Sequence, residues 1–177
     1  MSIPPDVQWA VRQRAQFACE FCGVTETDTG GELTIDHFQP HTKGGTNAPE
    51  NLLYCCHRCN QYKADYWPTQ PEAPHLWHPR HDPIERHLLL LADGTLYPIT
   101  EAGAFTLKRL RLNRPPLVAY RVRQQGEMAE HRVLTHYREL VVVLEQLHQQ
   151  QVALLEEQQR LLEEQRRLVQ LLLQQRA

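Results

Sequence analysis

Two cysteine pairs with the same short spacing constrain the fold of this chain more than any other feature. Cys19-Glu-Phe-Cys22 and Cys56-His-Arg-Cys59 are both C-x2-C turns, and such a turn presents two thiolates to one side of a metal ion. Two turns complete a tetrahedral site, so we expect these four cysteines to hold a structural Zn²⁺. The alternative is two unrelated buried pairs. Residues 23–55 separate the pairs, a longer span than in a zinc ribbon, so a folded segment must lie between them.

The fifth cysteine and the composition limit the other classes of protein. Cys55 is expected to pack as a small apolar residue, although a zinc register that uses Cys55 is a second possibility. An odd cysteine count argues against a secreted disulfide scaffold. The net charge of −2 means that any nucleic-acid surface must be a local patch. No apolar run approaches ~18 residues and no leader opens the chain, so we expect a cytoplasmic protein without a membrane partner.

Local patterns predict an α+β fold in three segments. Residues 1–66 contain expected helices over 4–17 and 59–66 and expected strands over 33–35 and 51–55. Residues 67–116 are rich in proline, with an Asp-Gly hairpin in "LLLLADGTLYPI" and a helix from Thr100 to Leu112. Residues 117–177 lack proline and read as one long helix, with an interruption near Gly126 as an alternative.

Between the cysteine turns, and just past the second, lie residues suited to phosphodiester chemistry. Asp36 and His37 end an apolar strand, and Asn60 follows the last cysteine. A carboxylate and an amide oxygen can hold Mg²⁺ or Mn²⁺, and an imidazole can take a proton from water. If zinc joins the two turns, His37 and Asn60 should come near each other.

Residues 19–63 resemble the HNH endonuclease family, in particular its zinc-stabilised bacterial branch. The elements are C-x2-C, a strand that ends in Asp-His, a Gly-Gly turn, Asn-Leu, and C-x2-C-N-x2-K. The resemblance implies a zinc-stapled ββα-metal core, with His37 as general base and with Asp36 and Asn60 as ligands of the catalytic ion. It also implies that Asn51 fastens the loop between the strands. Asn60 stands where the family name has its last His, and an amide oxygen suits a hard ion.

Several cations are candidates for phosphate contacts. These are Arg58 and Lys63 beside the second cysteine turn, and Lys108, Arg109, Arg111 and Arg114, which are expected on one helix. The alternative for Lys63 is a solvated residue on a helix surface, and the same alternative applies to Arg58. The alternative for the second group is that its cations stabilise the negative C-terminal end of their own helix. His75, His78 and His81 recur every third residue, but the prolines among them argue against a second metal site.

These observations predict a metal-dependent endonuclease that acts on nucleic acid, with double-stranded DNA as the expected substrate. The first rival is a zinc-dependent nucleic-acid-binding module that does not cut, and the second is an assembly protein whose tail is the functional part. Leucines and other aliphatics recur seven apart in the tail, at Leu154-Leu155, Leu161-Leu162 and Leu168-Val169. Such a repeat is typical of a coiled coil and predicts a homodimer through residues 130–175. The alternative is a helix that folds back on the accessory segment.

Overall fold

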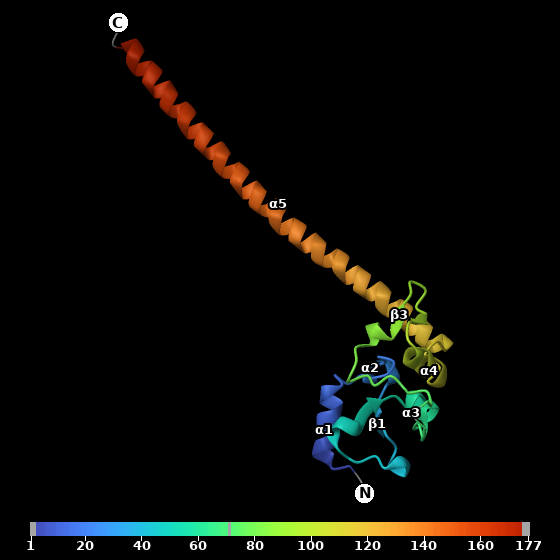
Figure 1. Cartoon of the computed structure of the whole chain (residues 1–177). Helices are drawn as coiled ribbons and strands as arrows, with labels where there is room; N and C mark the ends of the chain where they lie inside the picture. The colour runs from blue at the N-terminus through green and yellow to red at the C-terminus, as the bar shows by residue number, and fades with distance from the viewer. Residues whose placement is uncertain (1–2, 71, 175–177) are drawn as a thin grey trace. The chain divides into compact units, whose positions relative to one another are not determined.

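The computed structural model describes residues 3–70 and 72–174, and the predicted α+β class is confirmed (Figure 1). The chain divides into two compact units, Met1–Gln125 and Gly126–Ala177. The first unit therefore contains both the segment predicted as the nuclease core and the accessory segment.

The N-terminal part of the first unit is a two-stranded antiparallel sheet with three short helices. Its elements are α1 (Pro5–Arg14), α2 (Glu26–Thr29), β1 (Thr34–His37), β2 (Leu52–Cys55) and α3 (His57–Lys63). In the sheet, Asp36 lies opposite Leu53 and His37 opposite Leu52. The first helix ends before the predicted residue 17, because Gln16 and Phe17 adopt left-handed backbone angles that a helix does not allow.

Strand β2 lies in the middle of the core, and all four of its residues are buried. Leu53 and Cys55 pack into one apolar cluster with Phe21 and Trp77, whereas Leu52 and Tyr54 pack on the other side, against Val11 of α1. Alternate residues of a strand point to opposite faces, so β2 supports two apolar layers. Burial raises the pKa of the Cys55 thiol, as expected for a residue that packs as a small apolar group.

The accessory segment follows α3 and packs in the same unit. It contains the 3₁₀ turn η3 (Ile84–Arg86), the hairpin β3 (Leu88–Leu90) and β4 (Leu96–Pro98), and the helix α4 (Glu101–Arg109). Two further 3₁₀ turns, η1 (His41–Lys43) and η2 (Pro49–Asn51), lie between β1 and β2. Thr100 caps α4 by accepting a hydrogen bond from the backbone N–H of Gly103. The predicted extension of this helix to Leu112 is wrong. Arg111 is left-handed, with φ at 49°, and this turn buries both Leu110 and Leu112.

The last helix, α5 (Pro115–Gln174), belongs to both units. In the first unit it buries Leu117 and most of Arg121. In the second unit its described residues are exposed, and Gly126 does not interrupt it. No helix in the described part of the chain has an apolar stretch long enough to cross a bilayer.

Candidate functional site

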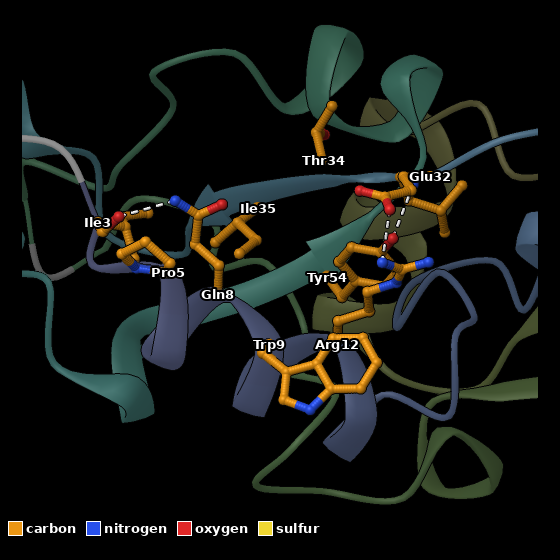
Figure 2. A pocket seen from close by; sticks show the side chains of 10 residues that line it. Ile3, Pro5, Gln8, Trp9, Arg12, Glu32, Thr34, Ile35 and Tyr54 are labelled. Atoms are coloured by element: carbon orange, nitrogen blue, oxygen red, sulfur yellow. Dashed lines mark hydrogen bonds and ion pairs between the residues drawn. The ribbon is translucent and has the colours of Figure 1, made fainter.

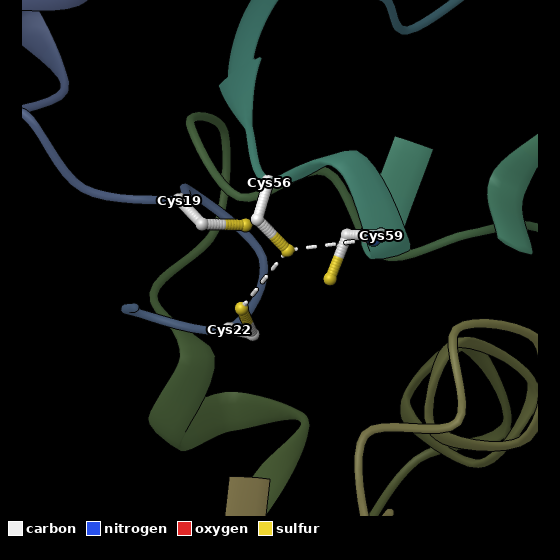
Figure 3. Close-up of side chains that lie close together, drawn as sticks. All are labelled: Cys19, Cys22, Cys56 and Cys59. Atoms are coloured by element: carbon white, nitrogen blue, oxygen red, sulfur yellow. Dashed lines mark hydrogen bonds between the residues drawn. The ribbon is translucent and has the colours of Figure 1, made fainter. Parts of the chain in front are cut away.

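The four cysteines predicted as zinc ligands meet at one point (Figure 3). The sulfur atoms of Cys19, Cys22, Cys56 and Cys59 all lie within 4.8 Å of one another. The Cys22 and Cys56 sulfurs are 3.7 Å apart, which agrees with the ~3.8 Å edge of a tetrahedron built on Zn–S bonds of about 2.3 Å.

The beginning of α5 and the turn before it are attached to this cysteine cluster. Arg114 places Nη2 3.9 Å from the sulfurs of both Cys56 and Cys59, where its charge offsets that of the thiolates. One and a half turns into the helix, the Tyr120 hydroxyl donates a 2.8 Å hydrogen bond to the carbonyl of Gly23, in the first cysteine turn. Cys19, Cys56 and Cys59 are buried and Cys22 is half-buried, as expected for a structural rather than a catalytic metal site.

Helix α3 lies against β1 and brings the Asp36 and Asn60 side chains to the same interface. Thr34 and Asp36 are two apart in the strand and share a face. The Asn60 amide Nδ2 donates to Thr34 Oγ1 at 3.3 Å, and Lys63 Nζ lies 2.9 Å from Asp36 Oδ2. Lys63 also donates to the backbone carbonyl of His37 at 2.6 Å. A carboxylate and an amide oxygen therefore lie on adjoining elements.

The burial of Lys63 was not indicated by the sequence. Its side chain is fully buried, so it is neither a solvated helix residue nor available to a phosphate, and its prediction as a nucleic-acid contact is wrong in this structure. Burial raises the pKa of Asp36, and the charge of Lys63 opposes that shift. Because Asp36 Oδ2 is buried beside Lys63, Oδ1 is the oxygen left for another partner.

The imidazole of His37 faces the loop that follows β1. Its Nε2 lies 2.8 Å from Oδ1 of Asn47, and Nε2 of His41 lies 2.8 Å from the same oxygen. The two imidazole rings are 4.2 Å apart between centroids. Neither Asn47 nor His41 was among the predicted site residues; their signal in the sequence was a pair of polar residues on either side of the Gly-Gly turn.

The loop that carries Asn47 is fastened by Asn51 and by close packing at Gly45. Asn51 Oδ1 accepts from the Gln39 N–H at 2.8 Å, and its Nδ2 donates to the carbonyls of Gln39 and Thr46. A Cβ on Gly45 would lie 1.8 Å from the Gln39 carbonyl oxygen, so only glycine fits there. The preceding Gly44 has φ at +85°, which glycine adopts at little cost.

The predicted basic cluster is divided among different environments. The prediction that these four cations lie on one helix is wrong, because α4 ends at Arg109 and Arg111 has a left-handed backbone conformation. Arg109 donates to the carbonyl of Lys63, the last residue of α3, and Arg114 donates to the carbonyls of Leu110 and Arg111. These two therefore complement helix ends. Arg58, Lys108 and Arg111 are exposed.

A groove of about 680 Å³ runs beside the exposed face of α3 and is lined by arginines and tyrosines. Its polar walls include Arg58, Tyr62, Arg114, Tyr120 and Arg123. Arg111 stacks over Tyr62 at 4.9 Å, and Arg123 forms an ion pair with Asp28 at 2.6 Å.

The histidine repeat does not bring together three possible metal ligands in the described part of the chain. His78 and His81 stack face to face at 3.8 Å, and burial together with nearby cations lowers the pKa of His78 to about 4. Within the described residues, the four cysteines are the one group of three or more His, Cys, Asp or Glu that could hold an ion.

A hollow of about 470 Å³ lies between α1 and the β1–β2 hairpin (Figure 2). Its charged lining residues are paired with each other, since Arg12 Nη1 lies 2.6 Å from Glu32 Oε1. Of the residues that line it, none is a predicted site residue.

Comparisons with known proteins match one segment of the chain, which contains the two cysteine turns. Residues 19–72 match the family model described as HNH endonuclease. Over 54 residues the chain is 43% identical to the CRISPR-associated endonuclease Cas9 of Corynebacterium diphtheriae. That alignment covers 30% of this chain and 5% of the relative, so the chain spans a small part of the relative's length. No solved structure gives a significant match.

Proposed function

Because residues 19–72 carry an HNH endonuclease domain, we propose that the protein is a metal-dependent endonuclease that hydrolyses phosphodiester bonds in double-stranded DNA. The observation that carries the proposal is that Asp36 and Asn60 both lie at the β1–α3 interface, Asp36 paired with Lys63 of α3 and Asn60 bonded to Thr34 of β1, with His37 next to Asp36 in the chain. A module that only binds nucleic acid has no need of all three.

Asp36 Oδ1 and the Asn60 amide oxygen are the proposed ligands of a Mg²⁺ or Mn²⁺ ion. Both are hard oxygen donors, and their small number leaves room for water and phosphate oxygens, as such ions prefer. When bound, the ion would stabilise negative charge on the phosphate and on the departing 3′ oxygen. Lys63 holds the other carboxylate oxygen and so fixes the direction in which Oδ1 points.

His37 is the proposed general base. Its imidazole takes a proton from water as the water oxygen attacks phosphorus in line with the bond to the 3′ oxygen. That bond breaks, the 3′ oxygen leaves with the bonding electrons and takes a proton from solvent water, and the products carry a 5′-phosphate and a 3′-hydroxyl. A half-buried imidazole next to the half-buried Asp36 carboxylate is suited to this role, since it reaches solvent and keeps a defined orientation.

The exposed cations beside α3 are the proposed contacts of the DNA backbone. Arg58 and Tyr62 line the groove, Arg111 lies over the Tyr62 ring, and Lys108 is exposed on α4. Stacking on Tyr62 holds the Arg111 guanidinium in a fixed plane, which reduces the entropy lost when it binds a phosphate. The chain has a net charge of −2, so binding should depend on this local surface and weaken with salt.

A homodimer through the last helix is the second part of the proposal. Beyond Gln125, leucines at positions 140, 147, 154, 161 and 168 repeat every seven residues, and all are at least half exposed. A strict seven-residue repeat keeps one stripe of a helix on a partner helix. A row of such leucines left in water would favour association, and a second copy supplies an identical stripe. Two nuclease domains would then act on one DNA.

Plasmid cleavage with a parallel gel shift tests the proposal. Purified protein should nick or linearise plasmid with Mg²⁺, whereas with Ca²⁺ it should bind DNA without cutting. The matched variant is His37→Ala, which leaves the four cysteines intact. Binding without cutting under every divalent ion would support the binding module instead, and neither binding nor cutting would support an assembly role.

A further inference from the structure

Asn47 lies next to the proposed general base His37 and has no role in the hydrolysis proposed above. Its Oδ1 lies 2.8 Å from Nε2 of His37 and 2.8 Å from Nε2 of His41. One amide oxygen has two lone pairs and can accept both hydrogen bonds. The two imidazoles therefore meet at a single acceptor.

The backbone around Asn47 is held on both sides. Thr46, directly before it, accepts through its carbonyl from Asn51 Nδ2 at 2.9 Å. Ala48, directly after it, donates its N–H to Thr46 Oγ1 at 3.3 Å. Because Gly45 also packs on the Gln39 carbonyl, the loop has little freedom to move the amide away from His37.

An amide oxygen accepts hydrogen bonds and cannot donate them. The Nε2 atom of His37 must then carry a hydrogen, and in a neutral imidazole this places the free lone pair on Nδ1. We infer that Asn47 is a positioning residue, which fixes the ring of His37 and keeps it in the tautomer whose basic atom is Nδ1. The inference rests on the proposed role of His37 as general base and adds which nitrogen accepts the proton from water.

His41 competes for the same acceptor and is not needed for this role. With a ring centroid 4.2 Å from that of His37, it shares the Asn47 oxygen and lies on the exposed side of the loop. If His41 is replaced by an aromatic ring without nitrogen, Asn47 can direct its oxygen to His37 alone. His41→Phe is therefore the matched control in the same loop.

The experiment compares Asn47→Ala, Asn47→Asp and His41→Phe in the full-length chain. Asn47→Ala should lower kcat for a duplex oligonucleotide by about 10- to 100-fold, a part of the ~10²- to 10⁴-fold that a positioned general base supplies. KM and the affinity for DNA in Ca²⁺ should stay within about twofold, because the amide does not touch phosphate in this scheme. Asn47→Asp keeps an acceptor and should restore most of the rate, and His41→Phe should cut at least as fast as the wild type.

A long-range ¹H–¹⁵N spectrum of the histidine rings gives a readout that does not depend on cleavage. His37 should carry its hydrogen on Nε2 in the wild type and populate both tautomers in Asn47→Ala. An unchanged kcat in Asn47→Ala, an Asn47→Asp variant as slow as Asn47→Ala, or an equal loss in His41→Phe would each overturn the inference. A wild type that cuts no DNA but has the Nε2–H tautomer would overturn the proposed function and leave the positioning intact.

Discussion

Replacing Lys63 by methionine tests how the fold sustains a buried carboxylate. Lys63 is fully buried, and its ammonium lies 2.9 Å from Asp36 and 2.6 Å from the carbonyl oxygen of His37. Methionine retains most of the volume of the aliphatic stem, so the cavity left behind is small. The main consequence of Lys63→Met is that the carboxylate of Asp36, whose Oδ2 is buried and whose side chain is 14% exposed, loses its counter-charge.

The expected loss of stability follows from two limits. Removing one partner of a buried ion pair costs about 3–5 kcal/mol. The carboxylate can escape part of that cost by binding a proton, which at pH 7 requires about 4 kcal/mol for a group with an unfolded pKa of ~3.9. We therefore expect Lys63→Met to lower the free energy of unfolding by about 3–4 kcal/mol at pH 7.

The sign of the pH dependence is also fixed. Burial raises the pKa of Asp36 in the folded state, and loss of Lys63 raises it further. The folded variant then binds more protons than the unfolded chain above pH ~3.9, so its deficit against the wild type grows with pH. Between pH 6 and pH 8 the growth should be at most about 1.4 kcal/mol per pH unit.

Tryptophan fluorescence during urea unfolding of the zinc-loaded protein measures this deficit. Trp9, Trp67 and Trp77 all lie in the first unit, so the signal reports the unfolding of that unit. The double variant with Asp36→Asn should be more stable than Lys63→Met alone, because no buried charge remains. Lys43→Ala, an exposed lysine in η1, is the control and should change stability little. A deficit below about 1 kcal/mol that is independent of pH would refute the reasoning.

Three further predictions concern the chemistry, the zinc site and the tail. His37→Ala should slow plasmid cleavage by at least ~10²-fold with zinc content unchanged, and cleavage at the wild-type rate would contradict the role of His37. Elemental analysis should find one zinc per chain, and Cys59→Ser should abolish tight zinc binding and remove on the order of 10 kcal/mol from folding; active protein without zinc would contradict this. Ending the chain before Leu140 should give a monomer by light scattering that still nicks DNA but makes fewer double-strand breaks, whereas a full-length monomer at micromolar concentration would contradict the dimer.

Features set by local chemistry could be predicted from the sequence. The C-x2-C spacing predicted which four cysteines meet, because each turn fixes two sulfurs on one side of the chain. The Asp-Gly turn predicted the β3–β4 hairpin, and Thr100 predicted the start of α4. In each case the residues that determine the structure lie within a few positions of one another.

Features that depend on distant packing could not be predicted in the same way. A lysine on a short helix looks solvated until the strand that it pairs with is known, so the burial of Lys63 had no local signal. The break at Arg111 follows from the burial of Leu110 and Leu112, which a helix cannot place on one face. The hydrogen bond from His37 to Asn47 depends on a loop shape that Asn51 sets from outside the turn.

Helix α3 explains why zinc and catalysis should be inseparable in this protein. At seven residues it is too short to be stable alone. Its beginning is attached to the zinc site through Cys56 and Cys59, and its end to β1 through Lys63. Asn60 lies between these two attachments, and its amide reaches Thr34 of β1 only while both attachments keep α3 folded against the strand. Loss of zinc should therefore remove a proposed ligand of the catalytic ion even though zinc takes no part in the reaction. This is why a variant such as His37→Ala, which leaves both attachments intact, isolates the chemistry.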